Sequence, residues 1–435
     1  MPDTAPAAPT APTAPAARAE GDAARVVWAG VVALAVAMGI GRFAFTPLLP
    51  LMLRDGTLDA AGGAEWAAAN YAGYLVGALW ASRFAAHPVS GLRSGVFGVA
   101  ASTLLVAWFD GPWAGALWRF AAGVFSAWSL VCTSSWCLQA LARSGRAARG
   151  AWIYCGVGLG IALAGAIAWL GGRQPAAWLW LELGVLAALG ALPVAHLIGT
   201  AGTSTATAPA SSPAPPSASS ASSTSTSTST SSSSSSPSTH AAGSAPRARQ
   251  RALVFCYGSF GFGYIVPATF LPTMAREQAA DPLIFGLTWP LFGSAAALSV
   301  ALAARHFTRW PRTRVWAAAQ ATMGLGTALV LATQALWALA LCALLVGGTF
   351  MVTTMAGLQL ARERAPANPT ALLARMTAAF AAGQIAGPLF VRAVGTSAPL
   401  GLDAMGWAHA TATLLLGATA VWLARSGAAR GHGER

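Results

Sequence analysis

Long apolar stretches, separated by short polar segments, recur along almost the whole chain. Twelve of them are long enough to cross a bilayer as helices. The short alternating segments that are typical of a membrane β-barrel are absent. The pattern therefore predicts an all-α integral membrane protein, embedded in a lipid bilayer, with twelve transmembrane helices. We expect the spans near residues 26–53, 65–86, 93–110, 112–141, 148–170, 176–198, 251–275, 283–304, 314–333, 335–361, 369–394 and 404–424.

The first apolar stretch contains a motif, Gly39–Met52, that returns as Gly261–Met274 at a separation of 222 residues. Arg42 corresponds to Tyr264 in this match. The fourth and tenth spans match at a separation of 220, which pairs Ser129, Thr133, Ser134, Leu138 and Gln139 with Thr349, Thr353, Thr354, Leu358 and Gln359. Chance similarity between helices rich in Leu, Ala and Gly is the alternative. Two matches at nearly one separation predict two related six-helix bundles in the same orientation.

Two segments have compositions that cannot bury apolar surface. Residues 1–24 are rich in Ala, Pro and Thr, and we expect a disordered tail. Residues 200–250 are rich in Ser, Thr, Ala and Pro, and we expect a cytoplasmic linker that acts as a tether. The predicted bundles are therefore residues 25–199 and 251–425, followed by a tail at 426–435.

The charge pattern predicts the topology. Only 9% of the residues are charged, against about a quarter in a soluble domain. All basic residues are arginines, and they lie mainly in short loops between the spans, so the net charge of +13 does not indicate nucleic-acid binding. With the N-terminus inside, twenty arginines lie in cytoplasmic loops and tails and four on the other side. The positive-inside rule then places both termini in the cytoplasm.

Motifs of catalysis and cofactor binding do not occur in a suitable context. The five cysteines lie inside apolar stretches without metal-ligand or disulfide spacing, which predicts buried core residues. No phosphate-binding loop, zinc motif, nucleophile elbow or dinucleotide motif is found. We therefore expect no cofactor, no metal site and no catalytic residues, and we disfavour an ATP-driven pump. A membrane-embedded enzyme and a structural or sensory membrane protein are the alternatives from other classes.

Three charged side chains fall inside predicted spans: Arg42, Arg119 and Glu182. A charge at membrane depth is costly and by default marks a transport pathway or proton relay. The alternatives are an ion pair that only fixes helix packing for Arg42, and extension of the side chain to the lipid headgroups for Arg119. Glu182 is the acid at membrane depth, so it is the candidate for proton coupling.

The fourth span carries a polar stripe. Arg119, Ser126, Ser129 and Thr133 fall within about one quarter of the helix circumference. Such a stripe faces either a cavity or a neighbouring helix, because small hydroxyl residues also hold membrane helices together. Glycines in the fifth and eleventh spans predict close helix approach. Further polar candidates inside spans are Tyr71, Tyr74, Tyr264 and Gln384.

Twelve spans, two halves, a long joint and cytoplasmic termini resemble the major facilitator superfamily. The first motif, the segment from Tyr257 to Pro272 and the segment from Gly347 to Arg362 resemble, more narrowly, its YbfB/YjiJ-like branch of bacterial transporters. One segment departs from the superfamily pattern. Ser82 stands where the cytoplasmic gate motif usually has Asp, while Arg83 keeps the basic position, which leaves the usual charge relay in doubt.

The resemblance implies that spans one, four, seven and ten line a central cavity. It therefore favours as substrate-binding residues Arg42, Arg119, Ser129, Thr133, Tyr264, Thr349 and Thr353, and it disfavours Glu182 in the peripheral sixth span. It also implies a secondary transporter of a small organic solute in a bacterial inner membrane, with protons as the expected coupling ion. Because a guanidinium binds carboxylates well, Arg42 favours an organic anion. Multidrug-type efflux of amphipathic compounds is the alternative.

Overall fold

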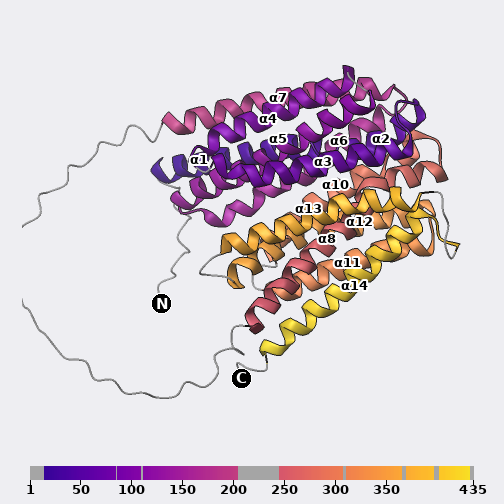
Figure 1. Cartoon of the computed structure of the whole chain (residues 1–435). Coiled ribbons are helices and arrows are strands. Elements are labelled where there is room, and N and C mark those ends of the chain that lie inside the picture. Colours follow the sequence, from indigo (N-terminus) through magenta and orange to yellow (C-terminus); the bar gives the residue numbers. More distant parts are fainter. Residues whose placement is uncertain are drawn as a thin grey trace, which may run out of the picture.

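The computed structural model describes residues 14–84, 86–108, 111–203, 244–306, 310–364, 369–395 and 401–431. Within these ranges the regular structure is helical. The helices form two bundles that lie side by side, with α1–α7 in one and α8–α14 in the other (Figure 1). α1 begins, α7 ends, α8 begins and α14 ends at the same end of the molecule (Figure 1). We call this end the termini face and the other end the opposite face.

The elements follow one another in the order of the predicted spans. The first span comprises α1 (Ala14–Leu34), a π-helical segment η1 (Ala35–Ile40) and α2 (Phe45–Arg54). The rest of the N-terminal bundle is α3 (Ala60–Trp80), η2 (Ala81–Phe84), α4 (Pro88–Trp108), α5 (Pro112–Arg143), η3 (Ala147–Tyr154), α6 (Cys155–Leu170) and α7 (Ala176–Thr203). The C-terminal bundle is α8 (Ser244–Gln278), α9 (Pro282–Phe285), α10 (Thr288–His306), α11 (Arg312–Ala332), α12 (Leu336–Arg364), α13 (Pro369–Val394) and α14 (Ala404–Gly431).

All twelve predicted spans fall on these helices, so the prediction of an all-α fold in two bundles is confirmed. By length and composition, 11 helices of the described residues are apolar enough to cross a membrane. The helix that falls short of this criterion is α3, which contains Glu65 and Asn70. Its 21 residues still match the thickness of a bilayer, and it packs against α5 and α13. The five cysteines are buried and unpaired, as predicted.

The boundaries of the predicted tails and linker need correction. α1 begins at Ala14, so residues 14–24 are helical rather than disordered; this segment is rich in alanine, the strongest helix former. Residues 200–203 extend α7, residues 244–250 begin α8, and residues 426–431 belong to α14. The remaining parts of these segments, 1–13, 204–243 and 432–435, lie outside the described residues.

The first span is interrupted at its motif, which the sequence pattern did not predict. The N–H of Gly41 donates to the carbonyl oxygen of Val36 at 3.0 Å, a separation of five residues that is typical of a π-helical turn. Pro47 has no N–H to offer to the carbonyl group of Phe43, so one helical hydrogen bond is missing next to this turn. The matching motif in α8 stays helical despite two internal prolines. The two halves therefore share a sequence motif but differ in its local structure.

The bundles meet mainly along three pairs of helices: α6 with α10, α3 with α13, and α2 with α8. Backbones touch at the first pair. A Cβ atom added at Gly158 would lie 2.2 Å from the backbone nitrogen of Ala297, and one added at Gly293 would lie 2.2 Å from that of Ala162. Only glycine fits at either position, which confirms the predicted close approach of the fifth span to another helix.

Candidate functional site

A cavity of about 600 Å³ lies between the two bundles. It extends from Arg42, at the break in the first span, to Arg362, close to the end of α12, so it reaches the termini face. This volume is typical of a small-molecule site. Its polar lining residues are Arg42, Tyr74, Ser134, Ser135, Gln139, Tyr154, Tyr257, Tyr264, Thr354, Arg362 and Thr377. The remaining lining residues are apolar, with Met38, Phe43, Leu130, Phe350, Met351 and Phe380 among them.

Tyrosine is rare in the chain and concentrated at this cavity. The chain has five tyrosines, and four of them, Tyr74, Tyr154, Tyr257 and Tyr264, line the cavity. The fifth, Tyr71, lies beside Arg42, with the guanidinium carbon 5.4 Å from the centre of its ring. Tyrosine combines an apolar ring with a hydrogen-bonding hydroxyl. The cavity wall can therefore bind an apolar body and still offer polar contacts.

Arg42 is the charged group at the inner end of the cavity. Its side chain is 3% exposed, and its guanidinium carbon lies 4.0 Å from the centre of the Tyr74 ring, a close cation–π contact. Its Nε and Nη1 atoms have no hydrogen-bond partner among the described residues. No ion pair of Arg42 occurs within the described ranges either. The guanidinium is therefore buried and only partly satisfied.

Arg42 forms one hydrogen bond to a side chain, and that bond crosses between the bundles. Its Nη2 donates to Oε1 of Gln384 on α13. Nε2 of Gln384 in turn donates to the hydroxyl of Tyr264 on α8. The Tyr264 ring is stacked between Phe350 and Phe380 at interplanar angles of 6° and 3°. The two residues that correspond in the repeated motif, Arg42 and Tyr264, are thus linked through one amide.

Arg119 lies apart from the cavity and bonds to the backbone of the first span. Its Nη1 and Nη2 donate to the carbonyl oxygens of Gly41 and Arg42 at 3.1 and 3.0 Å. The guanidinium lies between the rings of Phe45 and Trp180, with distances of 5.3 and 5.5 Å to their centres. It is 1% exposed and does not line the cavity. Arg119 was expected to contact substrate; the structure places it outside the cavity lining, where it satisfies the carbonyl groups that the helix break leaves free.

The predicted hydroxyl residues also lie outside the cavity lining. Ser129 and Thr133 are fully buried in α5, and a Cβ atom added at Gly95 of α4 would lie 2.2 Å from the Ser129 hydroxyl. On α12, Thr349 donates to the carbonyl oxygen of Leu345 at 2.6 Å, and Thr353 is fully buried. Of the predicted substrate-binding residues, only Arg42 and Tyr264 line the cavity.

Several lining residues were missed, although the sequence contained a signal for two of them. Ser134 on α5 and Thr354 on α12 correspond at the separation of 220 residues, and both line the cavity. They lie one position beyond Thr133 and Thr353, which turns them by about 100° around the helix. Tyr154 also lines the cavity and donates to the Ser134 hydroxyl at 3.0 Å.

Glu182 lies on the exposed outer side of α7 and does not line the cavity. Arg42 and Arg119, by contrast, are buried within the molecule, and no ion pair of Glu182 occurs among the described residues. At the expected cytoplasmic gate, Ser82 and Arg83 are exposed in η2, and Arg83 lies 5.5 Å from the centre of the Trp80 ring.

Contacts between the bundles continue from Arg42 toward the opposite face. The Thr46 hydroxyl donates to the carbonyl oxygen of Ala268 at 2.9 Å, and the hydroxyls of Tyr71 and Thr269 lie 2.9 Å apart. Near the opposite face, Arg392 of α13 pairs with Glu65 of α3 at 2.6 Å, and the Trp169 indole donates to the carbonyl oxygen of Leu283 at 2.8 Å. The bundles are therefore joined on this side of the cavity.

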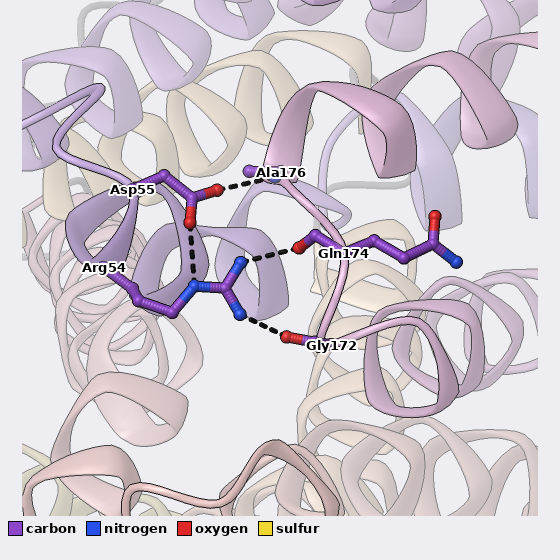
Figure 2. Close-up of polar contacts among 5 residues, drawn as sticks. All are labelled: Arg54, Asp55, Gly172, Gln174 and Ala176. Carbon is purple, nitrogen blue, oxygen red and sulfur yellow. Dashed lines mark hydrogen bonds and ion pairs between the residues drawn. The ribbon is translucent and has the colours of Figure 1, made fainter.

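Within the N-terminal bundle, the opposite face is held by Arg54 and Asp55 (Figure 2). Arg54 pairs with Asp55 at 2.7 Å and donates to the carbonyl oxygens of Gly172 and Gln174, while Asp55 accepts from the N–H of Ala176 at 2.7 Å. Burial opposes ionisation of Asp55. The hydrogen bonds from Arg54 and Ala176 and the positive charges nearby outweigh it, so the pKa of Asp55 is lowered.

Comparison with solved structures supports the fold. Two crystal structures of the nucleoside transporter NupG, one of them a mutant, match with a TM-score of 0.64 each. They are 14% and 13% identical to this chain, and the alignments cover 92% of this chain and 98% and 99% of theirs. A crystal structure of a D-xylose-proton symporter matches with a TM-score of 0.64 at 12% identity, covering 92% of this chain and 96% of that one. At such identities the likeness shows the fold alone.

No curated protein matches the sequence. A family model described as "Uncharacterised MFS-type transporter YbfB" matches residues 34–230 and 221–424. Together the two matches span nearly all of the described helices, and the two-bundle fold with a cavity between the bundles agrees with them. The chain therefore belongs to the YbfB family of major facilitator superfamily transporters.

Proposed function

We propose that this protein is a secondary transporter that moves a small organic anion across a bacterial inner membrane by alternating access. One observation carries the choice of an anion. Among the described residues, those that line the cavity include Arg42 and Arg362 and no Asp or Glu. A buried guanidinium without a carboxylate is costly, and an anionic group of the substrate would supply the missing partner.

The arginine count of the loops supports cytoplasmic termini. With that orientation, the cavity reaches the cytoplasmic side, and the contacts between the bundles close the periplasmic side. The structure then corresponds to a carrier that accepts or releases substrate on the inside. Rocking of the bundles about the α6–α10 contact would give access from the other side.

The wall of the cavity favours a substrate with an apolar body. Phe43, Phe350, Phe380 and four tyrosine rings line the same cavity as the guanidinium of Arg42, so an aromatic or branched hydrocarbon acid fits the chemistry. Multidrug-type efflux is the second candidate, because the same apolar wall would bind amphipathic compounds. The two candidates differ in charge selectivity, since cationic compounds would be repelled by Arg42.

Proton coupling is part of the proposal, but no Asp or Glu among the described residues lines the cavity to carry it. Glu182 lies on the outer side of α7 and is a poor candidate for the coupling group. Symport of a proton with the anion does not require a carboxylate in the wall, because the anionic group of the substrate can bind the proton itself.

Uptake into proteoliposomes tests the proposal. A panel of radiolabelled aromatic and aliphatic carboxylates, each paired with its neutral amide, is offered with and without a pH gradient. We expect uptake of at least one acid and not of its amide, and loss of that uptake in Arg42→Met. Arg173→Met, which removes an exposed arginine on the opposite face, is the control and should transport normally. Uptake of amides or cations that is unaffected by Arg42→Met would refute an anion carrier.

A further inference from the structure

The amide of Gln384 occupies a position where an anion would be expected. It is fully buried, it comes from the bundle that does not contain Arg42, and its oxygen accepts from Nη2 of Arg42. The orientation of the amide is fixed by chemistry. Arginine can only donate, so the oxygen must face Arg42 and the NH₂ group must face the hydroxyl of Tyr264.

A neutral amide is a weaker partner for a buried guanidinium than a carboxylate is. Both accept a charge-assisted hydrogen bond, but only the carboxylate adds a full opposite charge, whose attraction is strong in a buried site. Nε and Nη1 of Arg42 also remain without partners among the described residues. A carboxylate that enters the cavity would therefore compete well with Gln384 for Arg42, which lines the cavity and is reachable from it.

The same hydrogen bond joins the two bundles. Along the first span, Arg42 is followed one turn later by Thr46, whose hydroxyl donates to the carbonyl oxygen of Ala268. Along α8, Tyr264 is likewise followed one turn later by Ala268. The Arg42–Gln384 bond is thus the member of this set of contacts that lies at the cavity, and the others continue behind it toward the opposite face.

We propose that Gln384 is a placeholder for the anionic group of the substrate. When the anion binds, it replaces Gln384 as the hydrogen-bond partner of Arg42. The hydrogen bond at the cavity end of the closed interface is then broken, so binding favours opening at the opposite face. Gln384 is a positioning residue in this scheme, because it acts on the substrate through Arg42. The inference rests on the proposed transport of an anion.

Accessibility of a single cysteine at position 268 tests this scheme. Ala268 is fully buried at the interface, and its side chain is not needed for the bond from Thr46, which uses the backbone. The reporter Ala268→Cys is made in a full-length background without the five native cysteines, and its rate of labelling by a small thiosulfonate is measured in detergent. Sodium benzoate is the anionic probe and benzamide is its neutral control.

Two substitutions at Gln384 should have different effects on labelling. Gln384→Met removes both hydrogen bonds at similar volume, so we expect labelling to rise at least fivefold without benzoate and to change little when it is added. Gln384→Glu supplies a permanent carboxylate, so labelling should stay low and benzoate should have no effect. In the parent protein, benzoate should raise labelling and benzamide should not.

Gln320→Met is the matched control. Gln320 is also a fully buried glutamine with hydrogen bonds on both sides, to Trp316 and Thr419, but all three residues belong to the C-terminal bundle. We expect this variant to label like the parent. If Gln384→Met does not yield folded protein, Gln384→Glu still tests the placeholder role, because its side chain keeps the size and polarity of glutamine.

The outcomes separate this inference from the proposed function. If benzoate raises labelling of the parent but raises it equally in Gln384→Glu, the carrier binds anions and the placeholder role is wrong. If neither benzoate nor any acid transported in the uptake panel changes labelling of the parent, the inference is wrong whatever Gln384→Met does. If the uptake panel itself finds no transported acid, the proposed function fails first.

Discussion

Arg119 should be essential for stability rather than for substrate contact. Arg119→Met keeps a long side chain but removes the two hydrogen bonds to the carbonyl oxygens of Gly41 and Arg42. Each buried carbonyl left without a donor costs about 1–3 kcal/mol, so two cost about 2–6 kcal/mol. Loss of the contacts with the Phe45 and Trp180 rings increases this cost. Removal of a buried charge reduces it, because the variant no longer has to desolvate a guanidinium. We expect the free energy of unfolding to fall by about 3 kcal/mol.

Reversible unfolding in mixed detergent micelles, followed by circular dichroism, measures this change. Arg42→Met is the informative comparison, because Arg42 has a single hydrogen bond and two nitrogens without partners among the described residues. Removing it should change the free energy of unfolding by less than about 1 kcal/mol. The loss of the cation–π contacts and the hydrogen bond is offset, because the cost of burying the charge is also removed. The two arginines therefore predict opposite phenotypes: Arg119→Met destabilises, and Arg42→Met leaves a stable protein that does not transport.

The reasoning would be refuted by Arg119→Met protein that is as stable as the parent, or by Arg42→Met protein that is destabilised as much as Arg119→Met. Arg119→Lys sharpens the test. Lysine keeps the charge but cannot reproduce the planar fork that reaches two neighbouring carbonyl oxygens. It should recover part of the lost stability and not all of it.

Four further predictions concern transport, packing and pH. Arg42→Lys keeps the charge but loses the fork, so uptake of the anion should fall nearly as far as in Arg42→Met, with normal amounts of protein in the membrane. Gly158→Ala places a Cβ atom 2.2 Å from the backbone of α10 and should abolish transport, whereas Gly417→Ala, with nothing within 4 Å, should be neutral in the same uptake assay. Because the pKa of Asp55 is lowered in this closed arrangement, its contribution to stability is present above about pH 4 and is lost as the pH falls through its lowered pKa; thermal unfolding of Asp55→Asn and the parent should differ at pH 6, and the difference should shrink as the pH falls below about 4. Glu182→Gln should transport normally and keep its response to a pH gradient; a lost response would show that the outer side of α7 takes part in coupling.

Sequence patterns predicted the spans well and the site less well. The spans follow from apolar length, which the bilayer dictates directly. The break in the first span could not be predicted in this way. Glycine and proline, as at Gly39, Gly41 and Pro47, are also common in unbroken membrane helices, and the similar motif in α8 stays helical. The contacts of Arg119 with the freed carbonyl groups become visible only in the structure.

The polar stripe of α5 shows why side-chain roles were harder to predict. Ser129 and Ser134 are both serines in one helix at membrane depth, yet one packs against α4 and the other lines the cavity. A hydroxyl that holds two helices together and one that faces a cavity look identical in sequence. The sequence likewise cannot tell the role of Arg42 from that of Arg119. The role of each arginine depends on whether backbone carbonyl groups that lack a hydrogen-bond donor lie within its reach.

Four of the five tyrosines line the cavity and the fifth lies beside Arg42, which makes the site selectively visible to spectroscopy. Biosynthetic incorporation of fluorotyrosine would place every fluorine nucleus in the chain at or beside the cavity, with none in the outer helices. Tyr154 lies near the termini face and Tyr74 against Arg42, while Tyr71 bonds across the bundles to Thr269. A fluorine NMR spectrum of five lines would therefore report the mouth, the inner end and the interface at once, without any engineered label.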